Sequence, residues 1–417
     1  MLKCWLAGIA LAASFTASAA EEIQLHVFSG GANQRPDLIR KVFDDYEHKH
    51  PGVRIQLETG GATSELQRQY LSTVLSAKDS TLDLLALDIV NPAQFSAAGW
   101  LEPLDAYLGA GKEKRLKEYL PAYARSNVIG GKLVALPFVA DAMFLYYRKD
   151  LLEKYKQPVP KTWDELASVS RKIQEGEKGN LQGLSFQGAA IEGAVCTFLL
   201  PYWSQGKELQ DANGKLSLDK PAAVRGLKSW LSLVDQGVAK KNTAEVTTGD
   251  TVNEFKAGKV LFGINWGFAW DRFQQDKDSA VRDKVGVAVL PALAGGKSAS
   301  CIGGWQWGVS AFSKHKAESV RLAEYLSTPE VAKYLAVEGS LLPVYPQVYT
   351  DPDVVKAVPW FASAGPVVQS ARSRPVSPRY SEVSDKIRTV THAALAGATS
   401  PEQAVDDIES GLVRVLR

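Results

Sequence analysis

The run LDLLALD at residues 82–88 is almost continuously apolar and ends in a carboxylate. An apolar run of this length predicts a strand covered on both faces, as in a parallel sheet. Two further strands are expected before it: IQLHVFS at 23–29, which alternates apolar and polar residues, and VRIQLE at 53–58, which follows Pro51-Gly52. These three segments set the fold class.

Helical periodicity fills the two gaps between these strands. One face of residues 37–49 carries Leu38, Ile39, Val42, Phe43 and Tyr46. A second predicted helix carries Leu66, Tyr70, Leu71, Val74 and Leu75 on one face. The order strand, helix, strand, helix, strand predicts a parallel sheet with right-handed crossovers.

The rest of the chain repeats this alternation, and a second unit is predicted from about residue 138. Thr162 and Glu165 form a Thr-x-x-Glu capping box, which predicts a helix start. Strands are expected in GLSFQG, KVLFGIN, KVGVAVLPAL and WQWGVSAFS, with helices at 192–204 and after Ser400. A chain of 417 residues exceeds what one core usually holds, so two domains are expected.

The N-terminus, residues 1–20, has the layout of a cleaved signal peptide. Lys3 precedes an apolar run that is too short to span a membrane, and Ala-Ser-Ala-Ala provides small residues for cleavage. We therefore expect export to the periplasm. Cys196 and Cys301 then remain, and they form either a disulfide or two buried thiols.

Charge and motifs exclude several function classes. The formal net charge is +2, with acidic and basic residues interspersed, so no nucleic-acid partner is expected. Phosphate-loop, Gly-x-Ser-x-Gly and Cys–His nucleophile patterns are all missing from the sequence. We predict no cofactor and no metal.

Two carboxylates and several tryptophans are candidates for a ligand site. Asp88 ends an apolar strand and Asp141 follows another apolar run, and ligands of open α/β sheets bind beyond the carboxyl ends of strands. A sugar ring presents an apolar C–H face and a rim of hydroxyls, which suit an aromatic platform and carboxylates respectively. The stretch GINWGFAWDRF at 263–273 predicts such a platform.

The tryptophans of the second half differ in their immediate neighbours. Taken singly, each of them is more often a core residue than a ligand platform. Trp266 in INWG and Trp305 in GGW rank first, because the adjacent glycines permit a ligand to approach closely. The others considered are Trp203, Trp270 and Trp307.

The chain resembles the periplasmic solute-binding proteins of sugar ABC importers, of the large maltose-binding type. The resemblance rests on several stretches in a characteristic order, which cover nearly all of the mature chain. They are ALDIVNPAQFSAAGWLEPL (86–104), GKLVALPFVADAMFLYYRKDLLEKY (131–155), PKTWDELASVSRKI (160–173), FKAGKVLFGINWGFAW (255–270), KVGVAVLPAL (284–293), GGWQWGVSAFSKH (303–315) and RPVSPRYSEVSDKI (374–387). Within that family the trehalose/maltose-binding branch is the most similar.

This resemblance implies a set of sugar-binding residues. They are Arg68, Asp88, Asp141, Trp266, Gly304, Trp305 and Arg374, with Tyr146, Trp270 and Trp307 as further candidates. The branch often has a ligand-binding glutamate after the first strand, whereas here the loop reads SGGANQRPD. Gln34 or Asn33 is the substitute we expect, and the departure leaves the identity of the sugar open.

The resemblance also implies an α/β fold of two lobes, each a mainly parallel sheet flanked by helices. Three crossings of the chain join the lobes, and we place them near residues 137, 290 and 341. Lobe 1 is then 21–137 plus 291–340, and lobe 2 is 138–290 plus 341–417. The lobes would close on an α-linked disaccharide or short oligosaccharide and deliver it to an ABC permease and its ATPase in the inner membrane. A monomer is implied.

Two alternatives remain open from the sequence. The same importer role could serve a polyol or glycerol phosphate, although a phosphate would call for more arginine or helix N-terminal contacts. A secreted glycoside hydrolase could use Asp88 and Asp141 as its two carboxyl groups.

Overall fold

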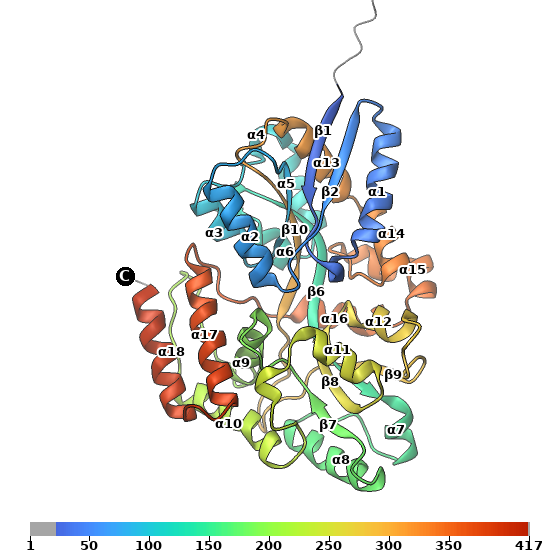
Figure 1. The fold of residues 1–417 in the computed structure, drawn as a ribbon, viewed down its shortest axis with the longest axis vertical. Coiled ribbons are helices and arrows are strands. Elements are labelled where there is room, and N and C mark those ends of the chain that lie inside the picture. Colours follow the sequence, from blue (N-terminus) through green and yellow to red (C-terminus); the bar gives the residue numbers. More distant parts are fainter. Residues whose placement is uncertain (1–21, 416–417) are drawn as a thin grey trace, which may run out of the picture.

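In the computed structural model, which describes residues 22–415, the three N-terminal strands lie side by side as predicted (Figure 1). They are β1 (Ile23–Phe28), β2 (Val53–Glu58) and β3 (Leu84–Asp88), and both β2 and β3 pair with β1 in parallel. The connecting helices are α1 (Pro36–Lys49) and α2 (Ser64–Ser76). The predicted strand–helix alternation is therefore confirmed.

A single long strand, β6 (Leu136–Arg148), links the two lobes. Its first half runs antiparallel to β10 (Ile302–Val309), which in turn pairs with β3. Its second half runs antiparallel to β8 (Val260–Trp266) and β9 (Val285–Ala288), and β7 (Gln182–Ser185) adds to β8 in parallel. The two-lobed α/β prediction is confirmed, with antiparallel pairs wherever β6 and β10 take part.

We propose that the chain passes between the lobes in β6, at the start of β10, and where Leu342 pairs with Ala140. The stretch after residue 290 stays with lobe 2, because the N–H of Ala292 donates to the carbonyl of Lys161 at 2.9 Å. We therefore propose a boundary at Ile302 in place of the one expected near 290.

Helices cover both faces of the lobes (Figure 1). In lobe 2, α17 (Tyr380–Leu395) and α18 (Pro401–Val415) pack against α9 (Glu192–Ser204) and α10 (Lys220–Asp235). The remaining helical elements are η1 (Ala32–Gln34), α3 (Pro92–Ala97), α4 (Asp105–Leu108), α5 (Gly111–Glu118), α6 (Pro121–Ser126), α7 (Lys149–Lys154), α8 (Trp163–Gly176), η2 (Thr243–Glu245), α11 (Thr248–Lys256), α12 (Ala269–Gln275), α13 (Lys316–Leu326), α14 (Pro329–Gly339), η3 (Pro346–Thr350), α15 (Pro352–Ala357) and α16 (Phe361–Ser370). A short hairpin is formed by β4 (Val128–Ile129) and β5 (Lys132–Leu133).

Local signals in the sequence explain several helix starts. The Thr162 hydroxyl accepts from the N–H of Glu165, and the Glu165 carboxylate accepts from the N–H of Thr162, so the predicted capping box is confirmed. The Ser400 hydroxyl accepts from the N–H of Gln403 at 3.1 Å and begins α18.

The two cysteines form a disulfide, which resolves the alternative left open by the sequence. Cys196 lies in the first turns of α9 and Cys301 immediately precedes β10, with their Cα atoms 5.7 Å apart. Both side chains are fully buried. The bond therefore fixes the beginning of α9 against the strand that enters lobe 1.

The predicted apolar face of α2 is wrong in its first turns. Leu66 is 50% exposed and Tyr70 is 38% exposed, whereas Gln67 and Arg68 are buried. Leu71 and Leu75 do face the core. The start of α2 therefore directs polar side chains inward, toward the space between the lobes.

Among residues 22–415, the helices are each too short or too polar to cross a membrane. The predicted signal peptide, residues 1–20, lies outside the described residues.

Candidate functional site

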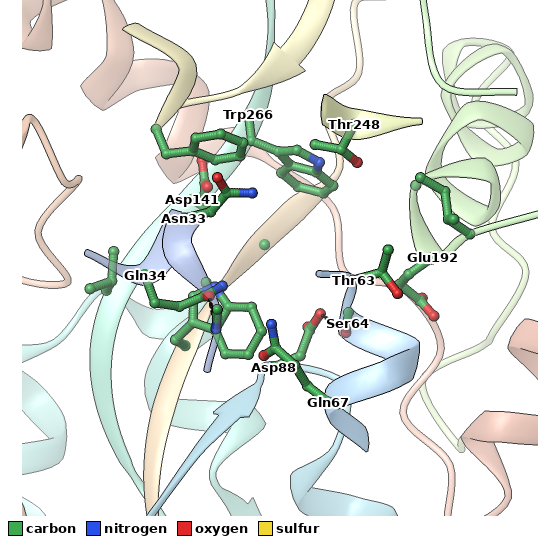
Figure 2. A pocket seen from close by; sticks show the side chains of 18 of the residues that line it. Asn33, Gln34, Thr63, Ser64, Gln67, Asp88, Asp141, Glu192, Thr248 and Trp266 are labelled. Carbon is green, nitrogen blue, oxygen red and sulfur yellow. Dashed lines mark hydrogen bonds between the residues drawn. The ribbon is translucent and has the colours of Figure 1, made fainter. Parts of the chain in front are cut away.

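A cavity of about 320 Å³ lies between the lobes (Figure 2). Its walls come from the loop after β1, the start of α2, the end of β3, the middle of β6, the end of β8, the start of α9 and the start of β10. The polar side chains on its walls are Asn33, Gln34, Thr63, Ser64, Glu65, Gln67, Asp88, Asp141, Glu192, Thr248 and Arg374. Aromatic walls are supplied by Phe138, Trp266, Phe268 and Trp305.

The two tryptophans on the cavity wall come from different lobes. Trp266 is the last residue of β8, and Trp305 lies in β10 directly opposite Asp88 of β3. Figure 2 shows Trp266 on one side of the cavity and Asp88 with Gln67 on the other. An aromatic face and a carboxylate thus oppose each other across the space.

Two glycines permit close packing at the start of β10. A Cβ at Gly303 would lie 2.7 Å from the Trp266 ring, so only glycine lets the ring pack there. Gly304 has a φ of +118°, and a Cβ on it would lie 2.4 Å from the carbonyl oxygen of Val139. Gly303 therefore leaves room for the Trp266 ring, and Gly304 permits the close approach of β10 to β6 just before Trp305.

Asp141 is held by backbone groups. Its Oδ1 accepts hydrogen bonds from the N–H of Gly267 at 2.6 Å and from that of Ala142 at 2.7 Å. Burial raises the pKa of Asp141 to about 7, and the nearby charge of Asp88 adds to this, while the two backbone donors oppose it. Asp141 thus lies on the cavity wall as a carboxyl group that titrates near neutrality.

Asp88 belongs to a buried ion network. Its Oδ2 accepts from the Ser64 hydroxyl at 2.6 Å, and its Oδ1 accepts from Arg374 at 3.2 Å. Arg374 also donates to Glu192 at 2.8 Å and to the carbonyl of Ile302 at 3.3 Å. Arg374 therefore connects a carboxylate of lobe 1 with one of lobe 2.

The charges in this network stabilise one another. Burial by itself would lower the pKa of Arg374, but Asp88, Tyr380 and Glu192 outweigh it, so that pKa lies above its ordinary value. Burial would likewise raise the pKa of Glu192, but Arg374 and Arg68 hold it below its ordinary value. Both groups are charged at neutral pH.

The structure brings most of the predicted site residues to this cavity. Asp88, Asp141, Trp266, Gly304, Trp305, Arg374 and Gln34 line it, as does Asn33. The loop after β1 therefore contributes Gln34 and Asn33 at the place where the trehalose/maltose-binding branch often has a glutamate.

Four predicted residues lie elsewhere. Arg68 is buried behind the wall, with its Nη1 3.6 Å from Glu192 Oε2. The Tyr146 hydroxyl donates to the carbonyl of Trp266 from beneath the strand. Trp270 stacks on Trp360 with the ring centroids 5.3 Å apart, and Trp307 packs in the lobe 1 core against Phe138.

Three carboxylate or amide residues on the wall escaped the sequence reasoning. Glu192 is the first residue of α9, a helix whose residues are all buried. The apolar sequence of that helix predicts a core element and gives no sign that its first residue lines a cavity. Glu65 and Gln67 lie in the first turn of α2. Apolar periodicity identifies only the apolar residues of a helix, so it did not indicate these two. Thr63, whose hydroxyl caps the start of α2, could have indicated Glu65 and Gln67, because it places the start of that helix near the ends of the strands.

Comparison with known proteins identifies the family. The profile of the family "Bacterial extracellular solute-binding protein" matches residues 32–333, and the chain belongs to this family. It is an ABC solute-binding protein of the maltose-binding type.

Individual relatives agree with this. A "Probable ABC transporter-binding protein" of Deinococcus radiodurans is 34% identical, with 99% of each chain covered. The maltose-bound MalE3 structure of T. maritima is 33% identical with a TM-score of 0.88, covering 94% of this chain and 99% of that one. A mannitol-binding protein of Pseudomonas aeruginosa is 23% identical, with 100% of this chain and 98% of that one covered.

Proposed function

We propose that this chain captures an α-linked disaccharide or short oligosaccharide, of the trehalose or maltose kind, in the periplasm. It delivers this cargo to an ABC permease and its ATPase in the inner membrane. It acts as a monomer without catalysis. The observation that carries the proposal is the pair Trp266 and Trp305, one from each lobe, facing a cavity that also holds Asp88 and Asp141.

The chemistry of the cavity suits a neutral polyhydroxyl ligand. An aromatic ring covers the apolar face of a sugar, while carboxylates accept hydrogen bonds from its hydroxyls. A volume of about 320 Å³ lies at the lower end of the range for small-molecule sites, which favours one or two sugar rings. The maltose in the T. maritima structure is a cargo of this size.

An anionic cargo is disfavoured by the charges on the walls. Glu65, Asp88, Asp141 and Glu192 line the cavity, whereas Arg374 is the only arginine among the lining residues and already pairs with two of these carboxylates. A phosphate would find no unpaired cation among the lining residues and would face their carboxyl groups instead. Glycerol phosphate therefore ranks below neutral sugars.

A polyol is the second candidate. The mannitol-binding relative matches the whole chain, and an open-chain polyol needs fewer aromatic contacts than a sugar ring.

The hydrogen-bonding group that Gln34 offers to a ligand affects the choice between these cargoes. Its Oε1 already accepts from the N–H of Gly31 at 2.7 Å, so the amide nitrogen is the group that can donate to a ligand oxygen. The Gln34 side chain therefore offers a hydrogen-bond donor to the ligand, whereas a glutamate at this position would offer only acceptors.

The decisive experiment is titration calorimetry of the mature protein with trehalose, maltose, sucrose, maltotriose, mannitol, sorbitol and glycerol phosphate. Selective binding of one disaccharide is the expected result. Binding of mannitol or sorbitol alone would keep the transporter role and replace the cargo. Incubation of the same sugars with catalytic amounts of protein tests the glycoside hydrolase alternative, since sustained release of monosaccharide would contradict a role limited to binding.

A further inference from the structure

Helix α2 of lobe 1 faces the first turn of α9 in lobe 2 through two charged side chains. The carboxylate of Glu65 accepts a hydrogen bond from the backbone N–H of Glu192, the first residue of α9. One helical turn further along α2, the guanidinium of Arg68 lies 3.6 Å from the carboxylate of Glu192. We call Glu65, Arg68 and Glu192 the α2–α9 clasp.

The clasp supplies a capping acceptor for the first backbone N–H of α9. The residue before α9, Ile191, has an apolar side chain and makes no capping hydrogen bond. The free N–H groups at a helix start favour a negatively charged acceptor. Glu65 provides that acceptor from the opposite lobe, so the start of α9 is capped only when the lobes are together.

Arg68 completes the balance of charge at this contact. Glu65 and Glu192 are both acidic, and burial together with the neighbouring Glu192 raises the pKa of Glu65. Arg68 is 6% exposed, and its guanidinium faces the start of α9, where it lowers the pKa of Glu192 together with Arg374. The nearby Arg388 lowers the pKa of Glu65 in the same way. Arg68 also lies 4.0 Å from Asp385 of α17, a second carboxylate of lobe 2. Arg68 therefore faces the other lobe and is not among the residues that line the cavity.

We infer that Arg68 and Glu65 are positioning residues that stabilise the closed arrangement of the lobes, and that Arg68 does so without touching the ligand. This inference rests on the proposed function. A ligand that binds the closed form better than the open form gains affinity from every contact made only on closing. Separation of the lobes would break the clasp, while the ion pair between Arg35 and Asp271 spans the lobes independently.

The test compares Arg68→Ala and Arg68→Lys with the wild type against every ligand that the wild type binds. Because the clasp acts on closure, Arg68→Ala should raise Kd and koff by the same factor for each ligand, about tenfold. Arg68→Lys should recover part of this loss, because it keeps the positive charge. The far-ultraviolet circular dichroism spectrum of the ligand-free variant should match that of the wild type, because opening of the lobes leaves the helices and strands of each lobe intact, and this excludes a merely structural role.

Lys228→Ala is the matched control, because it breaks the Lys228–Glu402 ion pair, which lies on the surface of lobe 2. It should leave Kd unchanged. Factors that differ strongly between ligands would show that Arg68 contacts the ligand and would overturn the inference. Unchanged Kd and koff in Arg68→Ala would overturn it as well.

The outcome is separable from that of the proposed function. If the wild type binds no sugar or polyol, the proposed cargo is wrong, and the clasp is then judged by small-angle scattering of the ligand-free chains. A larger radius of gyration in Arg68→Ala than in the wild type supports the clasp. Equal radii overturn it.

Discussion

The Oδ1 oxygen of Asp141 accepts a 2.6 Å hydrogen bond from the backbone N–H of Gly267, the residue that follows Trp266. The carboxyl group in the middle of β6 is thereby joined to the turn that carries the aromatic platform. Substituents on Gly267 would not be tolerated here, since a Cβ would lie 2.9 Å from Asp141 Oδ1. A change at Asp141 therefore affects both the charge and the position of the platform.

Asp141→Asn should change how stability depends on pH. The folded chain holds the pKa of Asp141 at about 7, above the value of about 3.9 in an unfolded chain. A carboxyl group with a raised pKa stabilises the fold while it is protonated, and this contribution is lost as the pH rises from about 4 to about 7. Relative to Asp141→Asn, the wild type should lose at most about 4 kcal/mol of unfolding free energy over that window.

Urea unfolding at several pH values from 4 to 8 measures this difference. Parallel stability curves for the two proteins would contradict the expected titration of Asp141.

Trp266→Phe should weaken ligand binding and remove most of the ligand-induced change in tryptophan fluorescence, because a smaller ring covers less of the sugar face. Trp270→Phe is the control. That ring stacks on Trp360 and is not among the cavity-lining residues, so its loss should leave the affinity unchanged. Equal effects of the two substitutions on Kd would remove Trp266 from the binding surface.

The double variant Cys196→Ser/Cys301→Ser should lower the unfolding free energy by about 2–5 kcal/mol. The bond closes a long segment, with a sequence separation of 105, and such a link restricts the unfolded chain strongly. Guanidinium denaturation of the oxidised wild type and the double variant measures the effect. Because both sulfurs are fully buried, reductant alone should leave the native wild type intact. Identical unfolding midpoints would contradict a stabilising bond.

Gly304→Ala should destabilise the fold by at least about 2 kcal/mol, because the new methyl group would strike the carbonyl of Val139 and the backbone φ is +118°. Gly52→Ala is the matched control, since a Cβ there meets no atom within 4 Å. Thermal unfolding of both variants should separate them clearly. A Gly304→Ala variant as stable as the control would show that β10 adapts to a side chain just before Trp305.

Much of the fold follows from local sequence signals. The strand at 53–58 and the helix at 192–204 form with the predicted bounds, because each is set by strong apolar patterning. The start of α2 does not follow this rule. Leu66 and Tyr70 are exposed there, since the buried side of that helix faces charged groups of another lobe and not an apolar core.

The candidate site was less accessible to sequence reasoning. Asp88 and Asp141 could be identified from their places after apolar runs. The adjacent glycines ranked Trp305 above Trp307. The structure agrees, because β10 runs from the cavity, where Trp305 lies, into the lobe 1 core, where Trp307 is buried. Glu192 depends on partners far away in the sequence, among them Arg374 and Ser384.

The helices α17 and α18 determine when lobe 2 can complete its fold. Val383 of α17 and Ile408 of α18 belong to the same hydrophobic core as Leu145 of β6 and Leu199 of α9. That core can be completed only after α18 has been synthesised. If the predicted signal peptide directs export, a nascent chain that lacks α17 and α18 keeps its second lobe incomplete, and this preserves the unfolded state that a secretion channel requires.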